Sequence, residues 1–216
     1  MRVGFTVSNS TATTGNGTDG IYVWQWQHER NESVTSPIFT TTAAVTRNAD
    51  VATITGTAFS GFWRSGPGSI LVRALPSTVS GTRPLVRVDD GTADNIIALR
   101  GNTTNPELYI KATSDQAAID AGTIAANTSY RLAGTWNTND CAASLNGAAP
   151  VLDTSAAIPA VTQMRIGSDG TNYLNGHIES IEYYDQRLLD ASMQVVSSPA
   201  GYRSIIGPVM RDTIIR

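Results

Sequence analysis

Residues 173–189, which read YLNGHIESIEYYDQRLL, decide the fold, and the pair Ile166-Gly167 precedes them across a short loop. The segment combines a glycine turn, a run rich in isoleucine and tyrosine, and a polar exit. β-Branched and aromatic residues that follow a turn are typical of a strand. We therefore expect a long strand over residues 177–184 that closes a β-rich domain.

A β-bulge is expected inside this strand. Ile178 and Ile181 lie three residues apart, whereas residues on one face of a regular strand are two or four apart. An extra residue near Glu179-Ser180 would restore a common face for the two isoleucines.

Short apolar runs recur upstream at regular spacing, with almost no helical periodicity. Turn residues separate them, for example at Gly66-Pro67-Gly68, Asp89-Asp90-Gly91 and Asn146-Gly147. Such spacing predicts an antiparallel sandwich. The other predicted strands cover residues 51–55, 58–63, 69–75, 84–88, 96–100, 107–112, 129–136, 142–145 and 163–166.

One short helix is expected over residues 189–196. Asp190 is suited to cap its first turn. Met193 and Val196 form a single apolar stripe at helical spacing.

The composition excludes several classes of protein. The chain has 216 residues, 41% of them hydrophobic, which is enough for one substantial core. Its formal net charge is −3, so it lacks the basic surface on which nucleic-acid binders depend. No window holds the roughly 18 apolar residues of a membrane span. Cys141 is the only cysteine, so no internal disulfide is possible, and we expect it to be a small buried residue of a strand.

The chain divides into three predicted segments. Residues 1–44 are a β-containing arm, residues 45–196 are the main domain, and residues 197–216 are a docking tail. In the arm, residues 21–28 alternate large and polar side chains, as a strand does. The predicted contacts with neighbouring subunits are Trp24 and Trp26 in the arm and Ile205, Ile206, Ile214 and Ile215 in the tail.

The closing segment resembles the last strand of laminin-G-like and pentraxin-like jelly rolls. There "IG", a gap, "FxGxIDEVxxYxRxL" and a short helix end the domain. Tyr173 replaces the Phe, Glu179 stands at the Asp position, and Ser180 departs from the Glu. The resemblance implies an all-β, concanavalin A-like (laminin-G-like) antiparallel jelly-roll sandwich with an N-terminal β arm and one short C-terminal helix.

A second resemblance points to bacteriophages. Residues 43–52, AAVTRNADVA, are similar to a segment common in tail-fibre and minor structural proteins of tailed phages, where it follows a strand like residues 22–29, YVWQWQHE. Residues 88–95, 128–133 and 139–147 continue the match in order. The resemblance implies a non-enzymatic virion structural protein of tail-fibre or spike type, with a lectin-like domain that binds host-surface carbohydrate.

The same resemblance implies where the protein acts and with what. It places the chain on the exterior surface of the virion, on tail or head, beside other virion proteins. Assembly with copies of itself, as a trimer, is expected by analogy with phage fibres. A capsid decoration or head-fibre subunit with a purely structural role is the alternative, because the chain is short for a tail fibre.

Sugar binding needs exposed aromatic faces that stack on C–H groups, and polar side chains that hydrogen-bond hydroxyls. Large aromatic residues of a sandwich mostly belong to its core, so each aromatic candidate also has a purely structural interpretation. The candidates for carbohydrate binding are Trp63, Arg87, Asp89, Trp136, Asn172, Tyr173, Tyr183 and Tyr184.

Catalysis and metal binding have weaker support. Sandwich glucanases place their acids two apart on one strand, so that the acids share a cleft, whereas Glu179, Glu182 and Asp185 lie three apart. A glycan hydrolase is therefore the second alternative. Residues 89–94 offer oxygen ligands for Ca²⁺ but lack the distal glutamate of an EF-hand, so a hairpin turn is the simpler interpretation. We predict no catalytic residue, no metal ligand and no cofactor, with Ca²⁺ as the open alternative.

Overall fold

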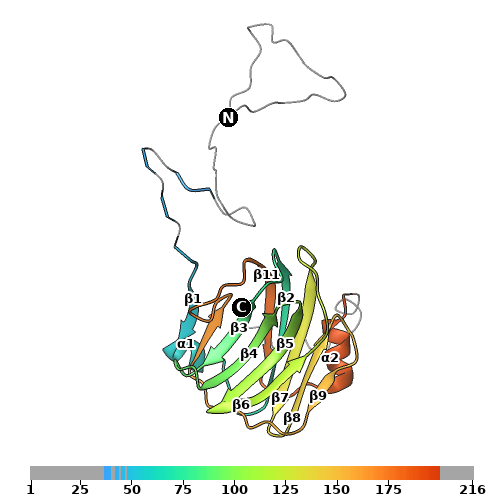
Figure 1. The fold of residues 1–216 in the computed structure, drawn as a ribbon. Coiled ribbons are helices and arrows are strands. Elements are labelled where there is room, and N and C mark those ends of the chain that lie inside the picture. Colours follow the sequence, from blue (N-terminus) through green and yellow to red (C-terminus); the bar gives the residue numbers. More distant parts are fainter. Residues whose placement is uncertain (1–36, 40–41, 44, 47, 200–216) are drawn as a thin grey trace, which may run out of the picture. The chain divides into compact units, whose positions relative to one another are not determined.

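Two antiparallel sheets packed face to face form the domain that the structure describes (Figure 1). The structure is a computed structural model that describes residues 37–39, 42–43, 45–46 and 48–199. The chain divides into two units, residues 1–47 and 48–216, and the sandwich belongs to the second. Several predictions lie outside the described residues: the strand at 21–28, the contacts of Trp24 and Trp26, and those of Ile205, Ile206, Ile214 and Ile215.

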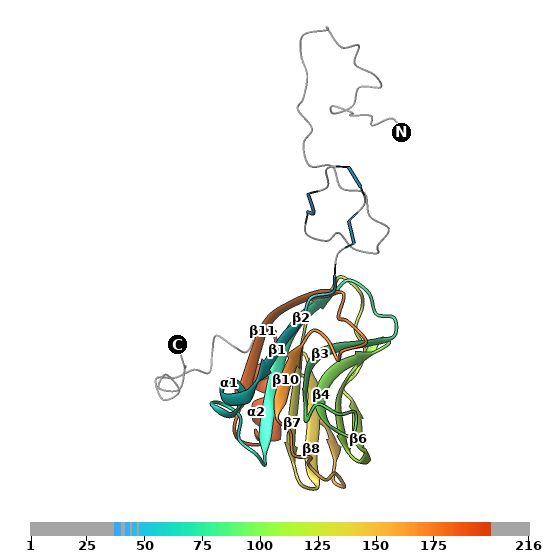
Figure 2. The same cartoon turned by 90° about the vertical axis from the view of Figure 1, so that its left-hand side faces the viewer.

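One sheet has six strands in the order β1-β10-β3-β4-β5-β6, and all neighbours are antiparallel. Strands β3 to β6 follow one another along the chain, whereas β10 joins the sheet from far downstream. Figure 2 turns the β1 edge of this sheet toward the viewer. The bounds are β1 (Ala52–Thr55), β10 (Gln163–Ile166), β3 (Thr82–Asp89), β4 (Asn95–Asn102), β5 (Asn105–Ala112) and β6 (Ser114–Asp120).

The other sheet has five strands in the order β11-β2-β7-β8-β9. The pairing of β11 with β2 shifts register between Ile178 and Ser180, which confirms the predicted bulge. Ile178 and Ile181 both pack against the core as a result. The bounds are β11 (Gly176–Tyr184), β2 (Gly68–Pro76), β7 (Tyr130–Asn137), β8 (Asp140–Leu145) and β9 (Val151–Asp153).

Alternate side chains of the strands fill the space between the sheets. The six-stranded sheet contributes Val88 and Leu99, and the five-stranded sheet contributes Val72 and Leu132, each at most 1% exposed. Cys141 is also fully buried, and burial raises the pKa of its thiol to about 11. The thiol therefore stays protonated at neutral pH, which confirms the expected structural role of this cysteine.

A short helix, α1 (Gly56–Ser60), occupies the place where a strand was predicted over residues 58–63. That prediction was wrong because Phe59, Phe62 and Trp63 follow helical spacing, with gaps of three and four residues. Two backbone bonds continue the turn, from Gly61 N to Thr57 O and from Trp63 N to Phe59 O. The aromatic side chains of α1 and its exit therefore reach the core together.

The second helix, α2 (Asp190–Ser197), confirms the helix predicted over residues 189–196. Asp190 does not cap it, because the carboxylate pairs instead with Arg187 at 2.8 Å. Met193 is fully buried and packs with Leu71 and Ala133. The helix thus covers part of the outer face of the five-stranded sheet (Figure 1). Across the described ranges, no helix combines the length and apolar character needed to cross a membrane.

Candidate functional site

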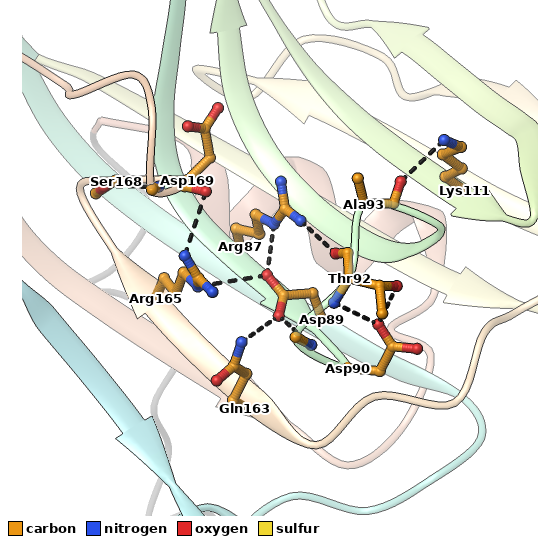
Figure 3. A network of polar contacts seen from close by, with 12 residues as sticks. Arg87, Asp89, Asp90, Thr92, Ala93, Lys111, Gln163, Arg165, Ser168 and Asp169 are labelled. Atoms are coloured by element: carbon orange, nitrogen blue, oxygen red, sulfur yellow. Dashed lines mark hydrogen bonds and ion pairs between the residues drawn. The ribbon is translucent and has the colours of Figure 1, made fainter.

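A polar network lies on the outer face of the six-stranded sheet (Figure 3). Alternation along the strands turns Arg165 and Arg87 away from the core, because their neighbours Met164 and Val88 lie in it. The register places Arg165 opposite Arg87, and Arg87 opposite Ala98. Tyr109 follows opposite Ala98, so four strands contribute one row of side chains to this face.

Asp89 is the centre of the network although its side chain is 0% exposed. Its Oδ2 accepts the Nε–H of Arg87 at 2.5 Å. Its Oδ1 accepts the backbone N–H of Gly91 at 2.8 Å and the side-chain amide of Gln163 at 2.5 Å. A buried carboxylate with this many donors fixes the position of the arginine beside it.

Arg165 reaches the same carboxylate from β10, but only at 3.6 Å between Nε and Asp89 Oδ2. Its Nη1 donates to Asp169 O at a long 3.4 Å. Gly170 leaves space for the Arg165 side chain, because a Cβ at this position would lie 2.6 Å from Nη1 and would displace it. Gly170 also has a φ of +95°, which favours glycine.

The loop after β10 carries two of the predicted carbohydrate-binding residues. Asp169 organises it, since its Oδ1 accepts the N–H groups of Thr171 and Asn172 and its Oδ2 accepts the Asn172 amide at 2.9 Å. Burial acts to raise the pKa of Asp169, but the bonds from Asn172 and Thr171 and the charge of Arg87 lower it overall. Tyr173 follows and is 43% exposed.

The turn between β3 and β4 borders the network on the other side (Figure 3). Arg87 Nη2 donates to Thr92 O at 2.7 Å. Asp90 accepts bonds from Thr92 and from the Asn95 amide, and these bonds lower its pKa to about 2. Its oxygens thus serve the turn, as the hairpin interpretation predicts. Among the described residues, no three His, Cys, Asp or Glu side chains gather where they could hold a metal ion.

Beyond Ala98 the row continues into an arginine–tyrosine pair. The guanidinium of Arg100 lies 3.6 Å from the ring centroid of Tyr109, and its Nε donates to Glu107 at 2.7 Å. Burial, with a hydrogen bond to Asp115, raises the pKa of Tyr109 to about 12. Lys111 lies on the same strand and donates to Ala93 O at 2.8 Å.

Trp63, Trp136 and Tyr183 depart from the expectation that they offer faces to a sugar. Trp136 is 1% and Trp63 7% exposed, and the two rings stack at 5.9 Å between centroids. Tyr183 stacks on Trp63 at 4.8 Å and bonds the backbone of Arg64 through its hydroxyl. Trp63 after α1 and Trp136 on β7 belong to the core, and Tyr183 on β11 packs against it. Tyr184 is half-buried and donates to Glu182 at 2.8 Å.

Of the predicted residues, Arg87 and Asp89 lie side by side on β3. Asn172 is bonded to Asp169, whose backbone oxygen Arg165 contacts, and Tyr173 follows in the same loop. Asp89 supports its neighbours rather than facing a ligand, because its oxygens are already bonded inside the sheet. Arg165, Gln163 and Tyr109 were missed. The alternation of Gln163-Met164-Arg165-Ile166 was a readable signal that Gln163 and Arg165 share a polar face.

The acidic residues considered for catalysis lie on or after β11, in the other sheet. Glu179 pairs with Arg73 at 2.7 Å, and Glu182 accepts the hydroxyl of Tyr184. Asp185 follows the strand and is exposed. The structure thus gives Glu179 and Glu182 separate partners.

No family model matches the chain, and no curated protein matches its sequence. Solved structures do match its fold. The CBM40 of the Ruminococcus gnavus IT-sialidase, bound to α2,3-sialyllactose, is 16% identical at a TM-score of 0.53, over 62% of this chain and 83% of that one. A native heptameric SAP-like pentraxin from Limulus polyphemus is 17% identical at a TM-score of 0.51, over 63% of this chain and 72% of that one.

Domain 4 of AbnA, a GH43 extracellular arabinanase from Geobacillus stearothermophilus, in complex with arabinotriose, is 15% identical at a TM-score of 0.53, over 64% and 69% of the two chains. These likenesses establish the fold as a concanavalin A-like jelly roll with a short C-terminal helix, as predicted. At such low sequence identity, these likenesses support only the fold.

Proposed function

We propose that this jelly roll binds carbohydrate without chemically altering it, on the outer face of the six-stranded sheet. The observation that carries the proposal is the pair Arg87 and Arg165, held on rigid strands next to a loop that exposes Tyr173. Arg87 donates hydrogen bonds from Nε to Asp89 and from Nη2 to Thr92 O. Its Nη1 has no partner among the described residues and is available to a sugar hydroxyl.

The carboxylates of this face support binding rather than hydrolysis. A glycosidase needs one carboxyl group whose raised pKa keeps it protonated as the general acid. Here the pKa of both Asp90 and Asp169 is lowered. Glu107 is paired with Arg100, and Asp89 is saturated by its donors. The function is therefore proposed to be non-enzymatic.

Two of the similar folds hold saccharides, sialyllactose in one and arabinotriose in the other. Binding by those proteins shows that the architecture presents surfaces suited to sugars. This precedent supports carbohydrate binding in general. The proposed location, the outer face of the six-stranded sheet, depends on the contacts of Arg87 and Arg165 described above.

We further propose that the chain is displayed on the exterior of a tailed-phage virion, in several copies. The support is the ordered similarity of residues 22–29, 43–52, 88–95, 128–133 and 139–147 to phage segments. Weak individual sites gain strength when several copies engage one cell surface. A sugar-binding domain displayed on the virion exterior would attach the phage to glycans of its host, which is the role that we propose.

Tyr173→Ala is expected to weaken binding by about five- to tenfold, because losing one aromatic contact removes roughly 1 kcal/mol. The ligand is the best-bound glycan from an array of bacterial surface saccharides, and calorimetry measures the affinity. Leu189→Ala is the control, since Leu189 is 72% exposed but directly precedes α2, which covers the other sheet. Equal losses in the two variants would exclude Tyr173, and an array without signal would refute carbohydrate binding.

An antibody against residues 48–199 is expected to label intact virions of the encoding phage and to block adsorption, because it would cover the proposed binding face. Electron microscopy locates the label, and a plaque assay measures adsorption. Capsid labelling with normal adsorption would favour the decoration role. Virions without label would contradict both roles.

A further inference from the structure

Arg165 is an under-satisfied cation in an otherwise well-bonded network. Its Nε is buried and has no hydrogen-bond partner among the residues that the structure describes. The contact of Nη1 with Asp169 O is 3.4 Å long. Arg187 also has an unbonded Nε, but its two other nitrogens form ion pairs of 2.7 and 2.8 Å. The ion pair that Arg165 forms, from Nε to Asp89 Oδ2, is longer at 3.6 Å, and a charged donor without a hydrogen bond is unfavourable.

The guanidinium of Arg165 is partly accessible to a ligand. Its side chain is 28% exposed, so part of the guanidinium faces solvent while Nε lies inside. Gly170 leaves room for Nη1, which a side chain at that position would displace. A partly exposed guanidinium with few hydrogen bonds can donate to a ligand.

The charge balance across the two strands points to the ligand's chemistry. Arg165 and Arg87 are cross-strand partners, and like charges in that relation repel. Asp89 lies between them but carries only one negative charge. The oxygens of Asp169 accept bonds from Thr171 and Asn172 within their own loop. Asp169, whose pKa the charge of Arg87 lowers, adds a second negative charge nearby. Because its oxygens are bonded within their own loop, Nη1 of Arg87 and the exposed part of the Arg165 guanidinium remain open to a further acceptor.

We propose that this face binds a sugar that carries a carboxylate, and that Arg165, with Nη1 of Arg87 beside it, receives that group. Arginine suits a carboxylate because its planar fork can donate two parallel hydrogen bonds. The inference rests on the proposed function and adds the ligand class to it. The shared chemistry is a carboxylate on a sugar ring, in a nonulosonic or a uronic acid.

Affinity for acid and ester forms of one saccharide tests the inference with the unmodified protein. The probes are α2,3-sialyllactose and a glucuronic-acid disaccharide, each against its own methyl ester. At least one acid is expected to bind about tenfold more tightly than its ester, since the ester removes the charge but keeps the ring. The acid that binds identifies the source of the carboxylate.

Arg165→Lys provides the second measurement. It keeps the positive charge but loses the fork, so the affinity for the acid is expected to fall about tenfold, and that for the ester is expected to fall less. Arg73→Lys is the matched control, because Arg73 lies in the other sheet and pairs with Glu179. Thermal melting confirms that both variants fold.

The outcomes separate the two proposals. Equal affinity for acid and ester, or binding of neutral array glycans alone, would overturn the carboxylate inference and leave carbohydrate binding standing. Failure of every saccharide to bind would overturn both. An unchanged preference for the acid in Arg165→Lys would remove Arg165 from the site.

Discussion

Trp136→Ala is expected to lower the free energy of unfolding by about 3–5 kcal/mol, the usual effect of emptying a buried tryptophan site. The ring is 1% exposed, stacks on Trp63, and donates its Nε1–H to Gly66 O at 3.1 Å. Gly68 lies against the ring, where a Cβ would be 2.5 Å away. Because glycine has no side chain, it cannot fill the gap that the ring would leave. Denaturant unfolding, followed by the shift of the midpoint, measures the loss.

Trp136→Phe serves as the control for this substitution. Phenylalanine retains an aromatic face for Trp63 but gives up the hydrogen bond to Gly66, so a smaller loss is expected. A loss below about 1 kcal/mol in Trp136→Ala would contradict the view that this ring is a centre of the core.

Asp89→Ala is expected to cost about 3–5 kcal/mol, because it leaves buried partners of a carboxylate without an anion. Arg87, whose side chain is 15% exposed, loses its 2.5 Å partner, and Gln163 and Gly91 lose an acceptor. Ligand binding should disappear as well, since Arg87 and Arg165 then repel each other without compensation. Denaturant unfolding and calorimetry on the selected glycan measure the two effects.

Two variants define the reason for the loss at Asp89. Asp89→Asn keeps the shape and an oxygen for Gly91, so an intermediate loss would isolate the contribution of the charge. Asp94→Ala breaks the 3.3 Å pair with Lys111, in which the aspartate is 64% exposed. That exposed pair should contribute less than about 1 kcal/mol. Similar losses in Asp89→Ala and Asp94→Ala would show that the buried network has no special role.

Local pattern was sufficient for most of the fold. The spacing of Ile178 and Ile181 predicted the bulge of β11, because one extra residue is the simplest way to return both to one face. β6 and β9 were missed, since β6 reads SDQAAID without large β-branched alternation and β9 has three residues. α1 was predicted as a strand because its aromatic residues favour strands, although Phe59, Phe62 and Trp63 have the spacing of a single helical turn.

The candidate site depended on information that local pattern does not contain. Alternation shows that Arg165 faces away from Met164, but only the pairing of β10 with β3 places it opposite Arg87. Gln163 and Asp89 are 74 residues apart in sequence and hydrogen-bonded in the structure. The burial of Trp63 and Trp136 was equally non-local, because it arises where α1 and β7 meet between the sheets.

Lys111 is the only lysine of the chain, and it lies on β5 in the outer face that carries the proposed site. Amine-reactive dyes and surface-coupling chemistries would therefore modify this position, together with the α-amino terminus. A sensor chip loaded in that way would hold the molecules by the surface under test and would report weak binding for a competent protein. Attachment through an engineered tag, or substitution of Lys111 by arginine before labelling, keeps that surface accessible.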